Sequence, residues 1–279
     1  MAENVRSQIK ESVLFVAIMT CRLLLGLVFL FSGITKAIDP AGGAIKVEEY
    51  FAAFGLSDMR WLALPFSINL AAVEFTLGVC MFLGVYRRYS SFFALLMMSF
   101  MTPLTLYLAL KNPVADCGCF GDALVITNWQ TFYKNIVLLG ASIVAFLFHK
   151  RTTAFFSFKV YWFVALFAYV YCLGFSLRNY NHLPIIDFRP FKVGTDISAG
   201  METPQDAPQD EYTYSFVYEK DGKEQTFSLD DAPSSDSTWT FVRSESQLIR
   251  KGYEPPISDF VVMTFDGEDM TESILGDTA

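Results

Sequence analysis

Two cysteines separated by a single glycine are the residues of this chain best suited to chemistry. Cys117 and Cys119 lie in the segment DCGCFGD, and the 279-residue chain has only five cysteines. Three interpretations are open, namely a structural disulfide, a metal site and a redox-active dithiol. A disulfide across one residue restricts the unfolded chain very little, and its strained small ring is easily reduced. The spacing therefore favours a redox pair in an accessible, glycine-rich turn.

The composition places this turn beside a membrane. Hydrophobic residues make up 53% of the chain and charged residues only 18%, which is too apolar for an ordinary soluble domain. Five apolar stretches are long enough to cross a bilayer core of about 30 Å as helices. The sequence predicts a mainly α-helical, polytopic membrane bundle over residues 1–179, in which the first stretch remains as an anchor. The stretches cover residues 13–35, 62–85, 91–110, 131–148 and 157–177.

The rest of the chain has a different composition. After residue 180 lie 20 of the 29 acidic residues but only 7 of the 21 basic ones. Alternating apolar and polar residues predict three strands, and Asp221-Gly222-Lys223 between the first two indicates a hairpin turn. We therefore expect a small, β-rich extracytoplasmic domain over residues 180–254. The three runs cover residues 212–220, 224–231 and 237–246.

The last segment, residues 255–279, contains a proline, a run centred on phenylalanine and a glycine turn. This order resembles the opening of a TlpA-like or peroxiredoxin-like thioredoxin domain. We interpret the segment as the start of a truncated thioredoxin-like module, which would be the electron partner of the cysteine pair. A simple β-hairpin is the alternative.

Basic residues in the short connections indicate which side of the membrane is cytoplasmic, because cytoplasmic loops carry an excess of Lys and Arg. Three basic junctions share one side if the N-terminus is cytoplasmic. Five crossings then place the acidic domain and the cysteine pair outside. The sequence predicts a bacterial inner-membrane protein with a periplasmic C-terminal domain, in a compartment where disulfides persist. The junction residues are Arg6 with Lys10, Arg87 with Arg88, and Lys150 with Arg151.

This topology weakens the metal interpretation. A closed zinc site takes about four Cys or His ligands, and only His182 and two aspartates lie on the predicted side of the pair. The other histidine, His149, is predicted on the opposite side, so the two cannot clamp one haem within the bundle. We expect no metal and no covalently bound cofactor.

Two charged residues lie deep in the predicted membrane helices. Arg22 is about 14 Å and Glu74 about 16 Å from the predicted cytoplasmic ends of their helices, at 1.5 Å per residue. Charges inside a bilayer are costly and usually have a partner. We expect Arg22 and Glu74 to form a buried ion pair that sets the helix register. A proton path or a quinone contact is the functional alternative.

Polar residues near the outer ends of the helices lie at the depth of the cysteine turn. Tyr107, Asn135 and Asn69 are the candidates to contact a membrane quinone that accepts electrons from the dithiol. The exposed aromatic residues nearby are typical of an interfacial belt. The quinone is therefore predicted as a non-covalent cofactor.

Three segments carry a resemblance to a known family. RLLLGLVFLFSGITKAIDP, AAVEFTLGVCMFLG and CGCFGD followed by NWQTFYKN resemble the DoxX-like superfamily. Within it, the CGCFG segment is most similar to the methylamine-utilisation MauE branch. The resemblance covers about residues 20–150. The fifth helix and the acidic domain depart from the pattern and resemble a Bacteroidetes-type periplasmic extension.

The resemblance implies a four-helix core that supports disulfide formation in periplasmic proteins. It implies that Cys117 and Cys119 are the redox pair, and that Arg22, Lys36 and Glu74 are a charged family signature. The methylamine substrate is not carried over, because this chain departs from the family pattern after the fourth helix.

These inferences lead to two hypotheses. In the first, the protein is a membrane thiol–disulfide oxidoreductase that passes electrons between a membrane quinone and a thioredoxin-like or other periplasmic partner. In the second, it is a non-catalytic membrane subunit or assembly scaffold of an envelope complex, and the cysteine pair is structural. A transporter is less supported, because no inverted repeat is visible. The bilayer and an oligomer or larger membrane complex are expected partners, and nucleic acid is not.

Overall fold

The structure, a computed structural model, forms two compact units, Met1–Phe188 and Arg189–Ala279, and each is described by itself. It describes residues 2–114, 116–182, 184–188, 192, 194–204, 206–209, 211–220, 223–228, 238–250, 252–253, 255, 257 and 260–276.

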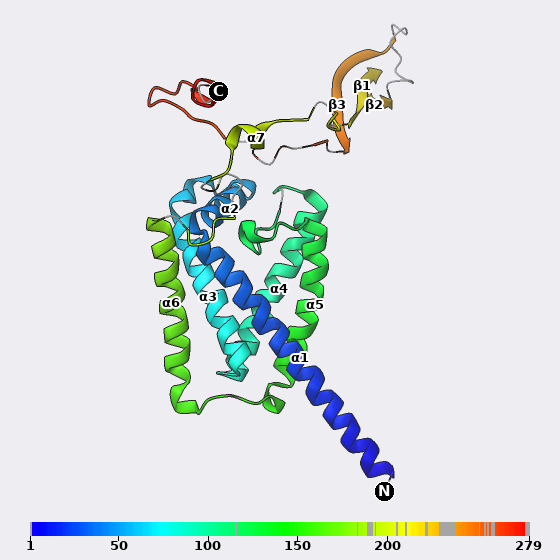
Figure 1. Cartoon of the computed structure of the whole chain (residues 1–279). Coiled ribbons are helices and arrows are strands. Elements are labelled where there is room, and N and C mark those ends of the chain that lie inside the picture. Colours follow the sequence, from blue (N-terminus) through cyan, green and yellow to red (C-terminus); the bar gives the residue numbers. More distant parts are fainter. Residues whose placement is uncertain are drawn as a thin grey trace. The chain divides into compact units, whose positions relative to one another are not determined.

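The first unit is a bundle of helices (Figure 1). Its helices are α1 (Ala2–Ile38), α2 (Pro40–Ala53), α3 (Ala63–Leu83), α4 (Arg87–Lys111), α5 (Asn128–Leu147) and α6 (Tyr161–Asn181). Short 3-10 helices cover Ser57–Leu62, Gly121–Ala123, His149–Arg151 and Phe158–Val160. Within the described residues, five helices are long and apolar enough to cross a membrane, and α2 is not among them. The predicted five-helix membrane bundle is therefore confirmed.

Helix α2 is the element of this unit that the sequence does not predict. It begins at Pro40, after Asp39, whose side chain accepts a hydrogen bond from the backbone of Gly42. An acidic N-cap followed by proline is typical of a helix start. With 14 residues, α2 is too short to cross a bilayer. It lies at the end of the bundle opposite the N-terminus (Figure 1).

Glycines allow α1 and α3 to approach each other closely. A Cβ added to Gly26 would lie 2.8 Å from the backbone nitrogen of Phe82. A Cβ added to Gly33 would lie 2.5 Å from the backbone nitrogen of Phe75. Small residues at such contacts let membrane helices pack backbone to backbone. The two contacts fix the antiparallel register of α1 and α3.

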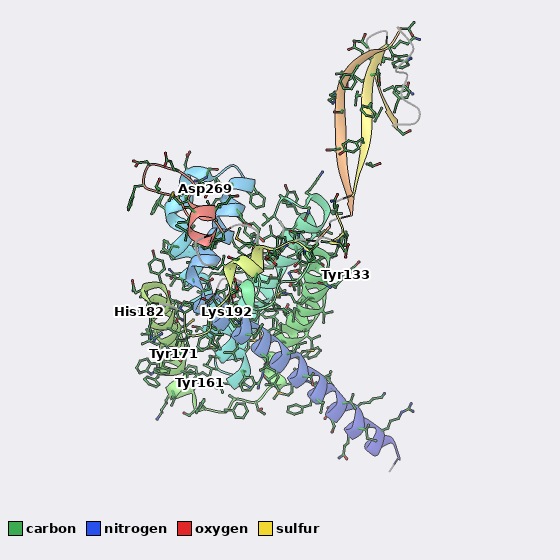
Figure 2. The ribbon with its side chains drawn as sticks, turned by 45° about the horizontal axis from the view of Figure 1, so that its top comes forward. Tyr133, Tyr161, Tyr171, His182, Lys192 and Asp269 are labelled. Atoms are coloured by element: carbon green, nitrogen blue, oxygen red, sulfur yellow. The ribbon has the colours of Figure 1, made fainter. Side chains whose placement is uncertain are left out.

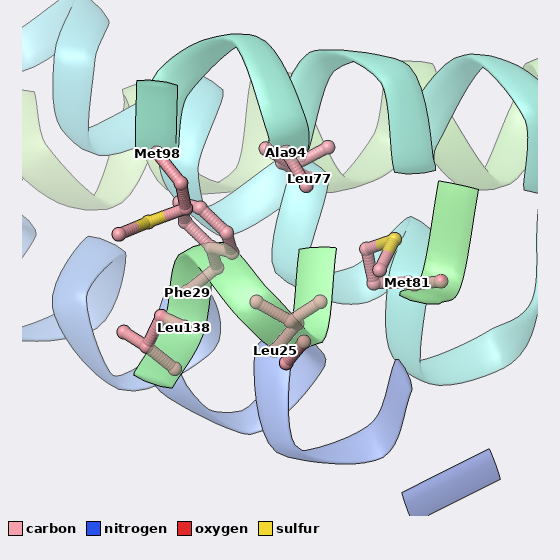
Figure 3. Packing of buried hydrophobic residues seen from close by; sticks show 9 residues of the cluster. Leu25, Phe29, Leu77, Met81, Ala94, Met98 and Leu138 are labelled. Carbon is pink, nitrogen blue, oxygen red and sulfur yellow. The ribbon is translucent and has the colours of Figure 1, made fainter. Parts of the chain in front are cut away.

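An apolar core fills the space between α1, α3, α4 and α5 (Figure 3). In a bilayer, such side-chain packing holds helices together in place of a hydrophobic driving force. On the outside of the bundle, Tyr133 on α5 and Tyr171 on α6 are exposed (Figure 2). The core residues are Leu25, Phe29, Leu77, Met81, Ala94, Met98, Leu138, Ala141 and Ala145.

The second unit contains a three-stranded antiparallel sheet in the order β2-β1-β3. The strands β1 (Glu211–Lys220), β2 (Lys223–Ser228) and β3 (Thr240–Arg250) confirm the predicted β-rich domain. Phe216 pairs with Phe227, and Tyr218 pairs with Phe241. Aromatic pairs of this kind stabilise a sheet. Two residues of the predicted hairpin turn, Asp221 and Gly222, lie outside the described residues.

Two short helices complete the second unit. They are α7 (Ile197–Met201) and α8 (Thr271–Gly276). An isolated antiparallel bridge joins Met263 to Asp269, just before α8. The thioredoxin-like interpretation of the last segment stays a prediction.

Candidate functional site

The cysteine pair lies in the connection between α4 and α5, which side-chain hydrogen bonds hold in shape. The Asn128 side chain donates 2.9 Å hydrogen bonds to the Asn112 side chain and to the Val114 carbonyl oxygen. Asp116 Oδ1 accepts a 2.8 Å hydrogen bond from the backbone of Gly118. Gly118 has a φ of 63°, which favours glycine over any residue with a Cβ. This glycine therefore allows the tight turn between the cysteines.

Both cysteines are free thiols, and their sulfur atoms lie 2.9 Å apart. Cys117 is 7% exposed and Cys119 is 9% exposed. The predicted accessible turn was therefore wrong on burial. The physical reason is that α2 covers the Cys117 side of the turn, whereas residues of the membrane helices enclose Cys119.

A buried network binds Cys119 to the membrane helices. Lys36 Nζ donates to Ser32 Oγ at 2.8 Å, to Glu74 Oε2 at 2.7 Å and to the Cys119 carbonyl oxygen at 2.9 Å. The Ser32 hydroxyl also lies 2.7 Å from Glu74 Oε2 and 2.6 Å from the same carbonyl oxygen. A lysine ammonium has three donors, so all three of its N–H groups are used. The network joins α1, α3 and the cysteine turn.

Glu74 therefore pairs with Lys36 and not with Arg22 as predicted. The Arg22 guanidinium instead donates to the carbonyl oxygens of Thr153, at 2.5 Å, and Phe82, at 3.4 Å. These partners belong to the end of the bundle away from the cysteine turn. The predicted Arg22–Glu74 pair was wrong.

The register of α1 and α3 explains the error. Arg22 lies one turn before Gly26, which contacts Phe82. Glu74 immediately precedes Phe75, which contacts Gly33. The sequence-based depths assumed that α1 enters the membrane at residue 13. The helix begins at Ala2, and its first part extends beyond the other helices (Figure 1).

A cavity adjoins Cys119 on the membrane side of the turn. Its volume is about 40 Å³, which is room for about three or four waters at roughly 10–15 Å³ each. Its polar lining groups include Ser32, Lys36 and Glu74 on one side and Lys134 and Asn135 on the other. Methionines of α4 close the apolar part. The lining includes Val28, Phe29, Met97, Met98, Met101, Phe120 and Leu138.

The charges around the turn distinguish the two thiols. The pKa of the Cys119 thiol is lowered to about 6, first by a hydrogen bond from Cys117 and then by the positive charges of Lys134 and Lys36. The pKa of the Cys117 thiol is raised by its hydrogen bond to Cys119 and by burial. Lys134 Nζ also lies 4.2 Å from the centre of the Phe120 ring, a cation–π contact. In the dithiol form, Cys119 is the sulfur that ionises first.

Helix α2 covers the other side of the turn, next to Cys117. The Tyr50 hydroxyl donates a 3.1 Å hydrogen bond to the Cys117 carbonyl oxygen. Lys46 Nζ lies 3.0 Å from Asp116 Oδ2 and 3.2 Å from Glu49 Oε2. Burial raises the pKa of Tyr50, so its hydroxyl stays protonated as a donor. Helix α2 therefore covers the turn on the Cys117 side.

Of the three residues predicted to contact a quinone, one lines the same cavity as Cys119. Asn135 lines the cavity, and its Nδ2 donates to Thr105 Oγ1 at 3.2 Å. Tyr107 stacks on Phe54, and Asn69 accepts a 2.7 Å hydrogen bond from Tyr169. Neither Tyr107 nor Asn69 belongs to the cavity lining.

Sequence reasoning missed Ser32 as a cavity residue, and Lys46 and Tyr50 as the cover of the turn. One signal was present, because Ser32 lies four residues before Lys36 and thus on the same face of an apolar helix. Among the described residues, no group of three or more His, Cys, Asp or Glu side chains is placed to hold a metal ion.

Comparison with known proteins supports the resemblance to the MauE branch. Residues 13–148 match the family of methylamine utilisation protein MauE, and residues 212–251 match a domain of unknown function, DUF8463. Protein TlpB of Flavobacterium psychrophilum is 26% identical over 136 residues, which are 48% of this chain and 37% of that relative. The chain thus spans little more than a third of the relative that it matches. No solved structure matches.

Proposed function

We propose that this protein is a membrane thiol–disulfide oxidoreductase. Its Cys117–Cys119 pair passes electrons between an extracytoplasmic thioredoxin-like partner and a membrane quinone. The observation that carries this proposal is the position of the pair at a boundary. Cys119 lines a cavity within the helix bundle, whereas Cys117 lies on the other side of the turn, beneath α2.

The proposed reaction balances with two electrons and two protons. A thiolate of the reduced partner attacks the Cys117–Cys119 disulfide, and the second partner thiol resolves the mixed disulfide. The partner leaves with a new disulfide, and the pair is left reduced. A quinone then takes two electrons from the pair and two protons from the pair and the surrounding water, becomes a quinol and restores the disulfide.

The cavity next to Cys119 is the proposed point of contact with the quinone. Its lining supplies donors for a quinone oxygen from Lys134 and Asn135. The space of about 40 Å³ is smaller than a quinone ring, so the cavity must widen for it. Met97 and Met101 lie in its wall, and methionine side chains repack readily. Entry from the bilayer beside α4 is therefore the expected route.

Mild reduction tests the redox role against the scaffold hypothesis. In membranes, the oxidised pair should be reduced by a low concentration of dithiol, because the ring is small and strained. Cys117→Ser and Cys119→Ser should each insert and fold, since so short a bridge contributes little to stability. Cys172→Ser, a change to a buried packing thiol on α6, is the matched control. Resistance to dithiol together with loss of folded protein in both variants would instead establish a structural pair.

The proposed orientation is a cytoplasmic N-terminus in the bacterial inner membrane. It is supported by the arrangement of the basic junctions, because Arg87 donates a hydrogen bond to the carbonyl oxygen of Thr152. Two of the three basic junctions thus lie together at one end of the bundle. A reporter that is active only outside the cytoplasm should work when fused after residue 279 and fail when inserted after Arg88. The reverse pattern would contradict the orientation.

A further inference from the structure

The ion pair between Lys36 and Glu74 needs an explanation beyond packing. Lys36 is 8% exposed and Glu74 is 3% exposed, within the membrane part of the bundle. Removing two charges from water costs several kcal/mol per ion, and apolar residues of similar size often serve stability as well or better. The close glycine contacts already lock α1 against α3. The pair therefore indicates a function at the place where it lies.

That place is the membrane side of the Cys119 thiol. Lys36 Nζ is hydrogen-bonded to the carbonyl oxygen of Cys119 itself, and the side chains of both residues line the same cavity. Glu74 and Ser32 also accept hydrogen bonds from the ammonium and so hold it in place. A cation fixed beside a thiol stabilises its thiolate.

Charged and titratable groups face Cys119 from the other elements as well. Helix α4 contributes only methionines to the cavity wall. Helix α5 contributes a second ammonium, and α2 contributes a phenol that contacts the neighbouring cysteine. The groups are Lys36 from α1, Tyr50 from α2, Glu74 from α3, Lys134 from α5, and Cys117 in the turn.

We propose that Lys36 is a positioning residue that holds the Cys119 thiolate at the cavity, with its ammonium fixed by Glu74 and Ser32. Reduction of the disulfide adds two electrons to the two sulfurs. Cys117 takes up a proton, and Cys119 keeps its negative charge beside Lys36. Cys119 is then the sulfur that delivers electrons into the membrane, and Cys117 is the one that exchanges with the protein partner. This assignment of the acceptor side rests on the proposed function.

The pH dependence of thiol alkylation tests the inference directly. The test uses the Cys117→Ser variant, in which the serine hydroxyl still provides a hydrogen-bond donor beside Cys119. The rate of Cys119 alkylation by a small membrane-permeant maleimide is measured from pH 5 to 10. We expect Lys36→Met to move the midpoint upward by about one pH unit, which is a tenfold lower thiolate fraction at neutral pH. Lys36→Arg should leave the midpoint close to its value with Lys36, because arginine keeps the positive charge.

Two further variants keep the test decisive. Lys46→Met removes an ammonium that packs on the same turn but pairs with Asp116, and it should leave the midpoint nearly unchanged. If Lys36→Met fails to insert, the neutral pair Lys36→Met with Glu74→Gln replaces it. This pair should still raise the midpoint, because Lys36 lowers the pKa of the Cys119 thiol more than Glu74 raises it.

An unchanged midpoint in folded Lys36→Met, or in the neutral pair, overturns the inference. An equal shift in Lys46→Met also overturns it, because the effect would not be specific to Lys36. The assay contains neither partner nor quinone. A shifted midpoint without quinone-dependent oxidation would therefore contradict the proposed function and leave the role of Lys36 intact.

Discussion

Two buried cations on α1 show how differently the two ends of one helix pair are used. Arg22 and Lys36 both lie on the helix that packs against α3, and both are almost fully buried. Arg22 donates to backbone carbonyl oxygens of the loop after α5 and of α3. Lys36 donates to a carboxylate, to a hydroxyl and to the backbone of a cysteine.

The difference between their partners indicates that Arg22 has a structural role, whereas Lys36 lies where chemistry can take place. Carbonyl oxygens do not titrate or react, so the contacts of Arg22 serve to fix a loop against the bundle. Lys36 is paired with the carboxylate of Glu74. The thiol of Cys119, which can change redox state, borders the same cavity as Lys36. We infer that the proposed redox chemistry takes place at the Lys36 end of the bundle. The following variants test the difference between the environments of Arg22 and Lys36.

The largest effect is expected for Glu74→Gln. This change leaves the ammonium of Lys36 buried without its counter-charge, which typically costs about 3–5 kcal/mol. The free energy of unfolding in micelles should fall by this amount. The double change Lys36→Met with Glu74→Met should recover most of the loss, because no charge is left unpaired. A double variant as unstable as Glu74→Gln would show that the pair contributes shape and not charge balance.

Arg22→Met should have the next largest effect. The Thr153 carbonyl oxygen loses its charged donor, at about 1–3 kcal/mol for one unsatisfied group, and the 3.4 Å contact with Phe82 adds little. Combined with Glu74→Gln, the two losses should add within about 0.5 kcal/mol, as for distant sites. The Lys36 and Glu74 changes should instead be coupled by more than about 1 kcal/mol. Strong coupling between Arg22 and Glu74 would contradict the observed pairing.

Gly118→Ala tests the turn between the cysteines. The positive φ of Gly118 costs a residue with a Cβ about 1–2 kcal/mol, and the added Cβ would lie 3.2 Å from Lys46 Cγ. We expect a loss of stability of this size, measured by thermal unfolding. Gly140→Ala on α5 is the control, because a Cβ there meets nothing within 4 Å. Equal behaviour of the two variants would contradict the strained turn.

The smallest effect is expected for Asp116→Asn. The Lys46–Asp116 pair is partly exposed and is worth at most about 1 kcal/mol, so its loss should loosen α2 only slightly. Alkylation of Cys117 by a membrane-impermeant reagent should rise by up to about fivefold, since 1.4 kcal/mol corresponds to a factor of ten. Glu49→Gln removes the other carboxylate near Lys46 without touching the turn. If Glu49→Gln accelerates the alkylation of Cys117 equally, the ion pair between Lys46 and Asp116 does not hold α2 against the turn.

The same contrast shows what the sequence could predict. Five apolar stretches and three alternating runs were sufficient for the membrane bundle and the sheet, because hydrophobic length and period determine those elements locally. The pairing of Glu74 depends on the helix register, which the glycines of α1 set through contacts with α3. No local pattern reports where an extended helix such as α1 meets its partner.

Burial of the cysteines was missed for a related reason. The turn itself is rich in glycine and reads as exposed, but α2 covers it through Tyr50 and Lys46. Helix α2 carries three charged residues in a short segment, so the sequence indicated a loop there and not a helix. The pair was identified from its spacing alone, whereas its surroundings required tertiary structure.

The most direct test of the central claim is the redox state of Cys117 and Cys119 in membranes with and without quinone. The pair is first reduced, the reductant is removed, and the thiols are counted by alkylation after addition of a soluble quinone analogue. The account predicts that quinone converts the pair to the disulfide, that one quinol forms per disulfide, and that the pair stays reduced when quinone is absent. Thiols that remain reduced in the presence of quinone, in folded protein, would contradict it.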